Sequence, residues 1–342
     1  MKNLKENDAF LGPEEEWERL EPYGDFSRKE LREILRLTLD RDEIRSHEVV
    51  TGGKCNTNIA VEFSDGERVV IRVYERDRWA CRRDQVITEE VACRVPVPKM
   101  LAAVVEPGRF SGAVAEKLAG RPVGVFEWVQ GRKPFEVFQR DAEAIEKVGF
   151  VLGQTLMNIH ESRRFSHHGL LDEELNYRRK FASTRASFVD FLEWSLTDGR
   201  AGQRLGASTV SRLRTFIDEN VHRLEAVEGA QGLVHGDYKS SNLLVGPVGD
   251  DWEVRAVLDW EFACAGTPLF DAATLLRNAD RWPGFSDGFA RGFKAGGGHL
   301  PDGWRRIVKL LDLMNLCGFL NGSEKREKTF EAVRALILET IS

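Results

Sequence analysis

Three polar residues in the second half of the chain have the types and the order that phosphoryl transfer requires. Asp237 ends a His-Gly-Asp sequence, Asn242 follows it by five residues, and Asp259 lies further along in the run Leu-Asp-Trp-Glu. A carboxylate such as Asp237 can accept the proton of a hydroxyl group. Amide and carboxylate oxygens, which Asn242 and Asp259 supply, are ligands that magnesium prefers. The three residues therefore predict that Asp237 is a proton acceptor and that Asn242 and Asp259 hold a metal ion against phosphate groups.

The sequence between these residues predicts that two of them lie close together. The apolar runs 243–245 and 254–258 flank a turn-rich stretch and are typical of a β-hairpin. An antiparallel pairing centred on 250–251 would place Asn242 opposite Asp259. Directly opposed residues have Cβ atoms about 4.5–5.5 Å apart, which is close enough to share an ion. A slip of one residue in the pairing would remove this coincidence.

Each of these residues has a simpler structural interpretation when it is taken alone. An isolated His-Gly-Asp sequence is usually a turn, and an aspartate that follows a strand, like Asp259, is more often a cap than a ligand. Their shared order and their apolar flanks favour the chemical interpretation. His235 is expected to hold the loop by hydrogen bonds and not to transfer protons.

The elements that must position these residues begin with a β-rich part of the chain. Ser27 and Glu30 match a capping box, and apolar residues at helical spacing follow them, so a helix near 28–39 is expected. Beyond it, apolar and β-branched runs predict strands, with one charged helix between them. The expected strands lie at 49–51, 59–63, 69–74, 112–118 and 122–129, and the inserted helix lies at 77–93. This order indicates a small, mostly antiparallel sheet.

After residue 131 the spacing of apolar residues becomes helical. Helices are expected at 145–160, 185–196 and 208–226, and again beyond the hairpin through to residue 342. The sequence thus predicts an α+β fold with two lobes. Its expected parts are an arm at 1–25, a β-rich N-terminal lobe at 26–130 and a helical C-terminal lobe at 131–342.

Composition narrows the classes of protein to consider. The 342 residues are 42% hydrophobic, which is ordinary for a globular protein. Their net charge is −6, so the chain as a whole has no positive field that would attract nucleic acid or an anionic membrane. No apolar run approaches the length that spans a bilayer, and no secretory signal is evident. The five cysteines are scattered, which argues against a disulfide framework or a zinc site. We therefore expect a cytoplasmic protein that binds neither nucleic acid nor membrane.

The residues described above resemble the catalytic region of the aminoglycoside phosphotransferase and choline kinase-like families. His235-Gly236-Asp237 with Asn242 is similar to their catalytic loop, to which protein kinases have a related loop, and Leu258-Asp259-Trp260 is similar to their metal-binding aspartate segment. Gly266-Thr267-Pro268 with Asp271 resembles the following Gly-x-Pro-x-x-Asp element, whose aspartate supports the loop. The resemblance covers about residues 45–320. It implies a bilobal protein-kinase-like fold that uses ATP and Mg²⁺.

The resemblance also implies a nucleotide site in the N-terminal lobe. Gly52, Gly53 and Asn56 stand between two expected strands, where glycines would let backbone amides approach phosphate oxygens, although a Gly-Gly pair is also typical of a plain hairpin. The chain contains no Walker sequence, which argues against a P-loop kinase. The hinge residues expected beside adenine, which could equally belong to the core, are Glu127, Trp128 and Val129.

Charged partners for the phosphates follow from the same resemblance. Arg72 occupies the position of the phosphate-binding lysine of protein kinases, and a guanidinium can contact two phosphate oxygens at once. The simpler interpretation of Arg72 is an outward-facing charge on an edge strand. The acidic partner of Arg72 is expected to be Asp84, with Glu89 and Glu90 as alternatives in the same helix. Lys239 matches a catalytic-loop lysine that faces the γ-phosphate in protein kinases, or it is simply a solvated loop residue.

Together these features predict a small-molecule kinase that moves the γ-phosphate of ATP to a hydroxyl acceptor bound by the helical lobe. An unspecified small alcohol ranks first as acceptor, an aminoglycoside-like molecule second, and choline, ethanolamine or homoserine third. A protein substrate is less favoured because the stretch 259–271 is too short for a long activation loop and no Ala-Pro-Glu element follows. The alternative from another class is a catalytically inactive nucleotide-binding scaffold, against which the presence of Asp237, Asn242 and Asp259 argues.

Overall fold

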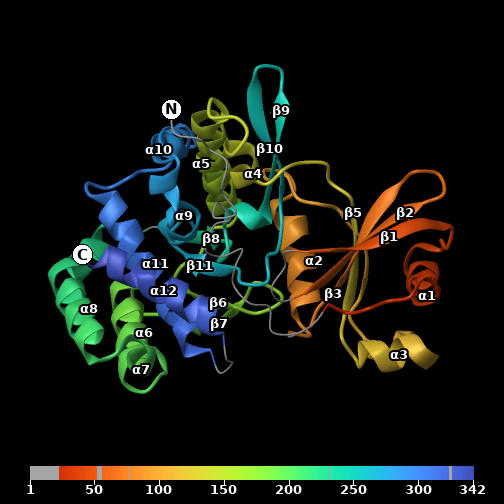
Figure 1. Ribbon diagram of the computed structural model, residues 1–342, viewed down its shortest axis with the longest axis horizontal. Helices are drawn as coiled ribbons and strands as arrows, with labels where there is room; N and C mark the ends of the chain where they lie inside the picture. Colours follow the sequence, from red (N-terminus) through yellow and green to blue (C-terminus); the bar gives the residue numbers. More distant parts are fainter. Residues whose placement is uncertain (1–22, 52–55, 76, 230, 323–325) are drawn as a thin grey trace.

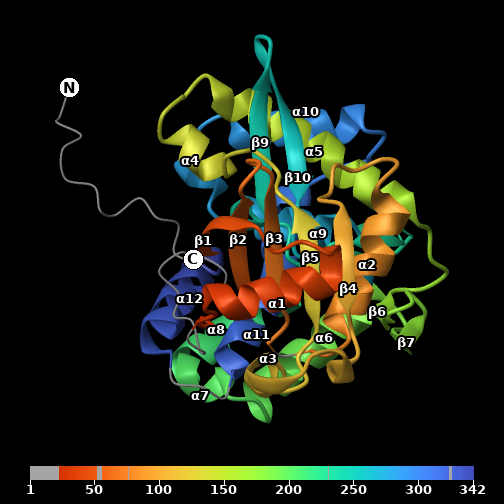
Figure 2. The same cartoon turned by 90° about the vertical axis from the view of Figure 1, so that its right-hand side faces the viewer.

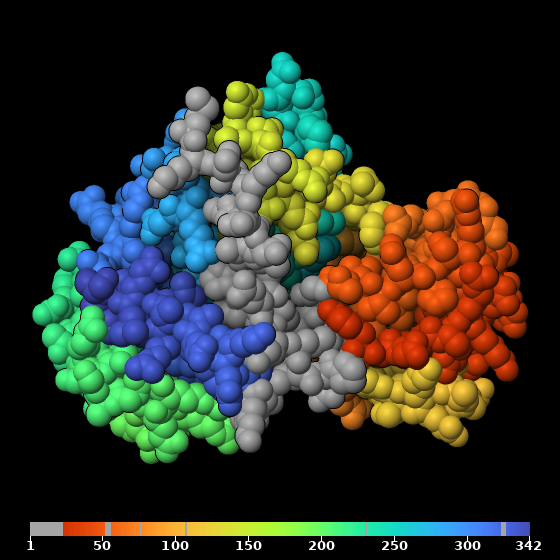
Figure 3. All heavy atoms as spheres, in the orientation of Figure 1, coloured from red at the N-terminus to blue at the C-terminus, as the bar shows by residue number. Residues whose placement is uncertain are grey.

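The computed structural model describes residues 23–51, 56–75, 77–229, 231–322 and 326–342. Figure 1 shows a sheet-containing lobe and a helical lobe, joined by an extended connection that follows β5 (Val123–Glu127). The space-filling view separates the orange N-terminal lobe from the green and blue C-terminal lobe (Figure 3). The predicted α+β, two-lobed architecture is confirmed.

The N-terminal lobe is built on one antiparallel sheet of five strands. In spatial order these are β1 (Ile44–Val50), β2 (Thr57–Phe63), β3 (Arg68–Val73), β5 (Val123–Glu127) and β4 (Met100–Val104). Its helices are α1 (Arg28–Leu39), α2 (Ala80–Val91) and α3 (Gly112–Leu118). The predicted first helix is confirmed, because Ser27 and Glu30 form the capping box and Leu31, Ile34 and Leu35 are buried.

The alternation of side chains along β3 decides which of them face the core of the N-terminal lobe and which face α2. Val69, Ile71 and Val73 pack into one core with α1 and α3. Successive side chains of a strand point to opposite faces, so Arg72 points to the other face, toward α2. Figure 2 shows α1 lying across the sheet and α2 beside it. Alternate residues of β3 thus face the apolar core of this lobe on one side and the polar residues of the candidate site on the other.

One predicted strand of this lobe is wrong. Residues 112–118 form α3, in which Val114 and Leu118 are buried four residues apart, the spacing of one helix face. The missing edge strand is β4, which pairs with β5 at Met100–Val104 and follows the prolines at 96 and 98. The β-branched content near 112–118 was too small to distinguish a strand from a short helix.

The C-terminal lobe is mostly helical, as predicted. Its helices are α4 (Pro134–Phe138), α5 (Ala144–Ser162), α6 (Thr184–Thr197), α7 (Ala201–Leu205), α8 (Ala207–Asn220), α9 (Leu269–Leu276), α10 (Phe285–Ala295), α11 (Trp304–Asn321) and α12 (Glu327–Thr340). Four short strands form a second sheet in the order β7 (Tyr177–Lys180), β6 (Gly169–Leu171), β11 (Cys264–Gly266) and β8 (Gly232–Val234). Within the described ranges, none of the helices is both long and apolar enough to cross a membrane.

The predicted hairpin is present as β9 (Leu243–Val248) and β10 (Asp251–Val257), which project from the lobe in Figure 1. Its predicted register is wrong. The turn is at 249–250, one residue earlier than expected, and an irregularity between Val254 and Ala256 shifts the pairing. As a result Asn242 lies beside Leu258, whose N–H donates to the Asn242 carbonyl at 2.9 Å. Asp259 is not opposite Asn242. It lies two residues after the end of β10, where its backbone turns out of the strand direction with a φ of 69°.

Candidate active site

The loop that carries Asp237 follows β8 and is held by a buried carboxylate, that of Asp271. Asp271, in the first turn of α9, accepts hydrogen bonds from the amides of His235 at 2.7 Å and Gly236 at 2.8 Å. Gly236 has a φ of 83°, and a Cβ at this position would lie 2.2 Å from the Phe262 carbonyl oxygen. The loop therefore requires glycine here. Burial raises the pKa of Asp271 to about 7, although the two amide donors act to lower it.

His235 has the structural role that was expected of it. The ring is fully buried, its Nε2 lies 3.0 Å from the Leu258 carbonyl, and its Nδ1 accepts from the Asp237 amide at 3.2 Å. These contacts suit a neutral ring that donates through Nε2, and burial lowers its pKa to about 4. His235 thus ties the loop of Asp237 to the segment that carries Asp259.

Among the described residues, the side chains of Asn242 and Lys239 contact Asp237. The Asn242 side-chain amide donates to the Asp237 carbonyl at 3.0 Å and to Asp237 Oδ2 at 2.9 Å. The Lys239 Nζ atom lies 2.9 Å from the same Oδ2 atom. Because Asn242 uses its nitrogen for these bonds, its Oδ1 atom is the one that would face a metal ion. The structure therefore brings Asp237, Lys239 and Asn242 together.

Arg72 connects the N-terminal lobe to Asp259. Its Nη1 atom lies 3.3 Å from Asp84 Oδ2, and its Nη2 atom donates to Asp259 Oδ1. Asp84 also accepts from the Tyr74 hydroxyl at 2.7 Å and from the Trp260 amide at 3.1 Å. Burial raises the pKa of Asp84 although Arg72 acts to lower it. Burial acts to lower the pKa of Arg72, but Asp259 and then Asp84 raise it well above its usual value.

The partner of Arg72 is thus Asp84 and not one of the two glutamates that follow it in α2. The Glu89 carboxylate accepts from Gln85, and the Glu90 carboxylate lies 3.6 Å from Arg163. Asp84 reaches Arg72 despite its short side chain because α2 packs directly against that face of the sheet.

Glu261 was not identified as a site residue from the sequence. Its Oε2 atom accepts from the Asn56 side-chain amide at 3.2 Å, and Asn56 Oδ1 accepts from the Glu75 amide at 3.3 Å. Burial, followed by repulsion from Asp259, raises the pKa of Glu261 to about 8. The signal in the sequence was a second carboxylate only two residues after Asp259. Its significance depends on Asn56, which comes from the other lobe.

The predicted nucleotide residues are only partly brought together. Gly52 and Gly53 lie outside the described residues. Glu127 ends β5, where its amide donates to the Lys99 carbonyl at 3.0 Å, and the Trp128 ring packs under Arg68 at 3.9 Å. Glu127 lies at the end of β5, and Trp128 and Val129 lie in the connection between the lobes.

The oxygen donors suit magnesium only in combination with phosphate groups. Among the described residues, no group of three or more His, Cys, Asp or Glu side chains is arranged to hold a metal by itself. Asn242 and Asp259 supply hard oxygen atoms, and Mg²⁺ commonly binds through one or two carboxylates together with substrate phosphates. The donor set therefore fits a nucleotide-bound Mg²⁺.

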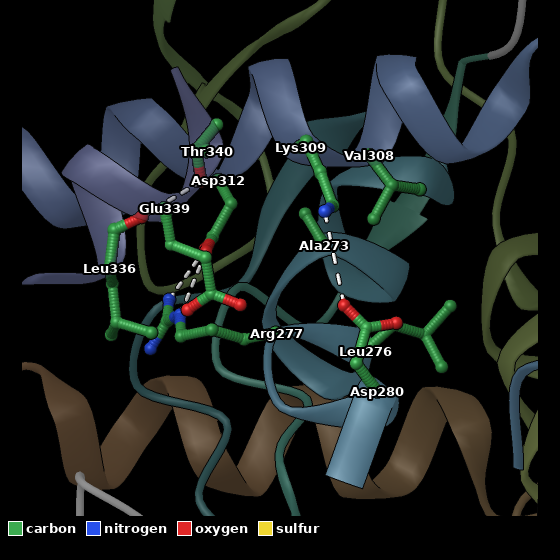
Figure 4. A pocket seen from close by; sticks show the side chains of 10 residues that line it. All are labelled: Ala273, Leu276, Arg277, Asp280, Val308, Lys309, Asp312, Leu336, Glu339 and Thr340. Atoms are coloured by element: carbon green, nitrogen blue, oxygen red, sulfur yellow. Dashed lines mark hydrogen bonds and ion pairs between the residues drawn. The ribbon is translucent and has the colours of Figure 1, made fainter. Parts of the chain in front are cut away.

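A separate small cavity lies between α9, α11 and α12 (Figure 4). Arg277 and Asp312 form a bidentate ion pair in it, and Lys309 points toward Asp280. Its volume of about 40 Å³ is enough for a few water molecules and too small for a substrate. None of the site residues described above lines this cavity.

Comparison with known proteins agrees with this geometry. The sequence model of the phosphotransferase enzyme family matches residues 46–308. No curated protein sequence matches the chain.

Several solved structures share the fold. One is aminoglycoside phosphotransferase APH(4)-Ia, with 13% identity, a TM-score of 0.67, and coverage of 92% of this chain and 98% of that one. A second is a GDP complex of an aminoglycoside 2'-phosphotransferase-IIIa mutant, with 15% identity, a TM-score of 0.63 and coverage of 92% and 95%. A third is macrolide 2'-phosphotransferase from Brachybacterium faecium, with 17% identity, a TM-score of 0.56 and coverage of 85% and 92%. The predicted resemblance is confirmed, because the family match covers most of the sequence: the chain belongs to the phosphotransferase enzyme family.

Proposed function

We propose that this phosphotransferase moves the γ-phosphate of ATP, with Mg²⁺, to a hydroxyl group of a small molecule. The observation that carries the proposal is the position of Asp237. Its carboxylate contacts Asn242 and Lys239, and the preceding amides of the same loop donate hydrogen bonds to Asp271. A fixed carboxylate beside candidate metal ligands is what transfer to a hydroxyl needs, because catalysis of this reaction depends mostly on positioning and on charge stabilisation.

In this mechanism Asp237 accepts the proton of the acceptor hydroxyl as the oxygen attacks the γ-phosphorus, the bond from that phosphorus to the bridging β-γ oxygen breaks, and ADP leaves. Asn242 orients Asp237 through its amide nitrogen and offers its oxygen to the metal, while Asp259 offers a carboxylate. When bound, Mg²⁺ would neutralise charge on the phosphate oxygens. Lys239, whose Nζ atom lies beside the Asp237 carboxylate, would stabilise negative charge on the transferred group.

We assign nucleotide binding to the N-terminal lobe and the connection between the lobes. Arg72 would contact phosphate oxygens while Asp84 holds its guanidinium, and Asn56 would act with the glycines at 52 and 53 at the phosphate end. Glu127, Trp128 and Val129 would lie beside the base. Support comes from a solved structure with the same fold, an APH(4)-Ia mutant described as a ternary complex with AMP-PNP and hygromycin B.

The acceptor is proposed to be a small alcohol bound by the C-terminal lobe. Structures with the same fold are described with hygromycin B or as macrolide phosphotransferases. A protein substrate is disfavoured because β11 and α9 follow Asp259 closely, with β11 beginning at Cys264 and α9 at Leu269. This leaves no room for a long activation loop.

The test is ADP release from Mg-ATP in the presence of a panel of amino sugars, amino alcohols and other small alcohols. Release that depends on one acceptor and requires Asp237 is the expected result. Nucleotide binding without release for any acceptor, and without slow hydrolysis of ATP, would instead indicate an inactive scaffold.

A further inference from the structure

Three consecutive residues of the Asp259 segment are held by side chains of the N-terminal lobe. Arg72 contacts the Asp259 carboxylate, and Asp84 accepts from the Trp260 amide. The third residue, Glu261, is held at two points. Its side chain accepts from Asn56, and its carbonyl accepts from Arg83 Nη1 at 2.6 Å. The other end of the segment is fixed in the C-terminal lobe, where the Leu258 amide donates to Asn242.

Arg83 is the member of this set to which the proposed function gives no role. It precedes Asp84 in α2, and its side chain is only 10% exposed. Its one carboxylate partner among the described residues is Asp77, at 3.5 Å, and its buried Nε atom has no hydrogen-bond partner there. Burying a guanidinium with incomplete pairing is unfavourable, so the fold gains little stability from this arrangement. A contribution to function explains why the side chain is turned inward onto Glu261.

The geometry indicates what that contribution is. Asp259 has a φ of 69°, a left-handed backbone conformation that residues other than glycine seldom adopt unless the surrounding structure holds them in it. Bonds to Leu258 and Glu261 hold the backbone on both sides of it. Without the Arg83 bond, the backbone after Asp259 loses one of these two restraints, and the Asp259 carboxylate, which is already paired with Arg72, is no longer held in a single orientation.

We propose that Arg83 is a positioning residue that sets the Asp259 carboxylate for metal binding by holding the Glu261 carbonyl. This inference rests on the proposed function, in which Asp259 is a ligand of nucleotide-bound Mg²⁺. Arg83 acts through the backbone and touches neither metal nor nucleotide. Its loss should therefore reduce the part of nucleotide affinity that depends on Mg²⁺ and spare the part that does not.

The experiment is calorimetric titration of the full-length protein with ADP, once in MgCl₂ and once in EDTA, for wild type, Arg83→Gln and Arg83→Lys. The quantity compared is the ratio of the two dissociation constants. Arg82→Gln is the matched control, because Arg82 is the adjacent arginine of α2 and also bridges the lobes, but to Glu174. Removing a residue that orients a metal ligand typically lowers metal affinity about 10–100-fold.

We expect Arg83→Gln to reduce the magnesium enhancement of ADP binding about 10–100-fold, with unchanged affinity in EDTA. Arg83→Lys, which keeps the charge and one donor, should give an intermediate ratio, and Arg82→Gln the wild-type ratio. An equal loss in both buffers would overturn the inference, as would a wild-type ratio in Arg83→Gln. If Arg83→Gln does not fold, a wild-type ratio in Arg83→Lys would overturn it. Absence of ADP binding by wild type in both buffers would contradict the proposed function itself.

Discussion

The side-chain amide of Asn242 donates to Asp237 twice, to its main-chain carbonyl at 3.0 Å and to its Oδ2 atom at 2.9 Å. One residue thus fixes both the backbone and the carboxylate of the proposed base. The 3-10 turn at Ser240–Asn242 brings the amide back to Asp237, and β9 begins at the next residue. The orientation of the base is therefore coupled to the start of the hairpin that leads to Asp259.

The first prediction concerns Asp259, the proposed metal ligand. Asp259→Asn should abolish the magnesium enhancement of ADP binding, because an amide oxygen carries no charge to offset that of the cation. The bond to Arg72 also changes, so binding in EDTA is measured beside it. A magnesium enhancement equal to that of wild type would show that Asp259 does not hold the metal.

The second prediction concerns the buried partner of Arg72. Among the described residues, Asp84→Asn leaves the Arg72 guanidinium with Asp259 as its remaining carboxylate contact, and losing a hydrogen bond to a charged group costs about 1.5–3 kcal/mol. The free energy of unfolding, measured by urea denaturation, should fall by that amount. Glu89→Gln in the same helix is the control and should change it by less than about 0.5 kcal/mol. Equal effects of the two substitutions would contradict the assignment of Asp84.

The third prediction separates backbone conformation from close packing at Gly236. Gly236→Ala places a Cβ in a conformation that costs about 1–2 kcal/mol and also against the Phe262 carbonyl. Gly297 has a φ of 89° with no atom within 4 Å of an added Cβ, so Gly297→Ala measures the conformational cost alone. We expect turnover to fall about 100-fold or more in Gly236→Ala, since misplacing a reacting group by about 1 Å can have that effect. Turnover in Gly297→Ala should stay within about twofold of wild type, and equal losses in both variants would count against a special role for the loop geometry.

The fourth prediction is a pH dependence of stability. The pKa of Asp271 is about 7 in the folded chain, above the ordinary value of 3.8 expected on unfolding. The folded state therefore binds more protons between these values, and the stability contributed by this group is present below about pH 4 and is lost as the pH rises toward 7. Relative to Asp271→Asn, the wild-type free energy of unfolding should decline by a few kcal/mol over this range, at about 1.4 kcal/mol per pKa unit. A difference between the two proteins that stays constant from pH 4 to 8 would refute the raised pKa.

The local features of the fold could be predicted where one strong signal was present. The capping box at Ser27 and Glu30 gave the first helix, whereas the contact between Asn242 and Asp237 was found only in the structure. The hairpin was predicted, but its register was not, because the irregularity before Ala256 follows no sequence rule that we could apply. The short helix at Gly112–Leu118 was mistaken for a strand for want of a long periodic pattern.

Contacts between the lobes were the hardest to predict. The pair Arg72 and Asp84 could be proposed because a family pattern pointed to both residues. Arg83 and Glu261 are 178 positions apart, and their bond depends on how α2 docks against the segment after Asp259. Local periodicity and composition carry no information about contacts between residues so far apart in the sequence, so the bond between Arg83 and Glu261 could be identified only from the structure.

The central claim, that Asp237 is the base of a small-molecule kinase, is tested most directly by acceptor-dependent ADP release in wild type and Asp237→Asn. The asparagine variant keeps nearly the same shape but cannot accept a proton, so turnover with the best acceptor should fall about 10²–10⁴-fold while the affinity for Mg-ADP changes little. Equal turnover in the two proteins would contradict the account.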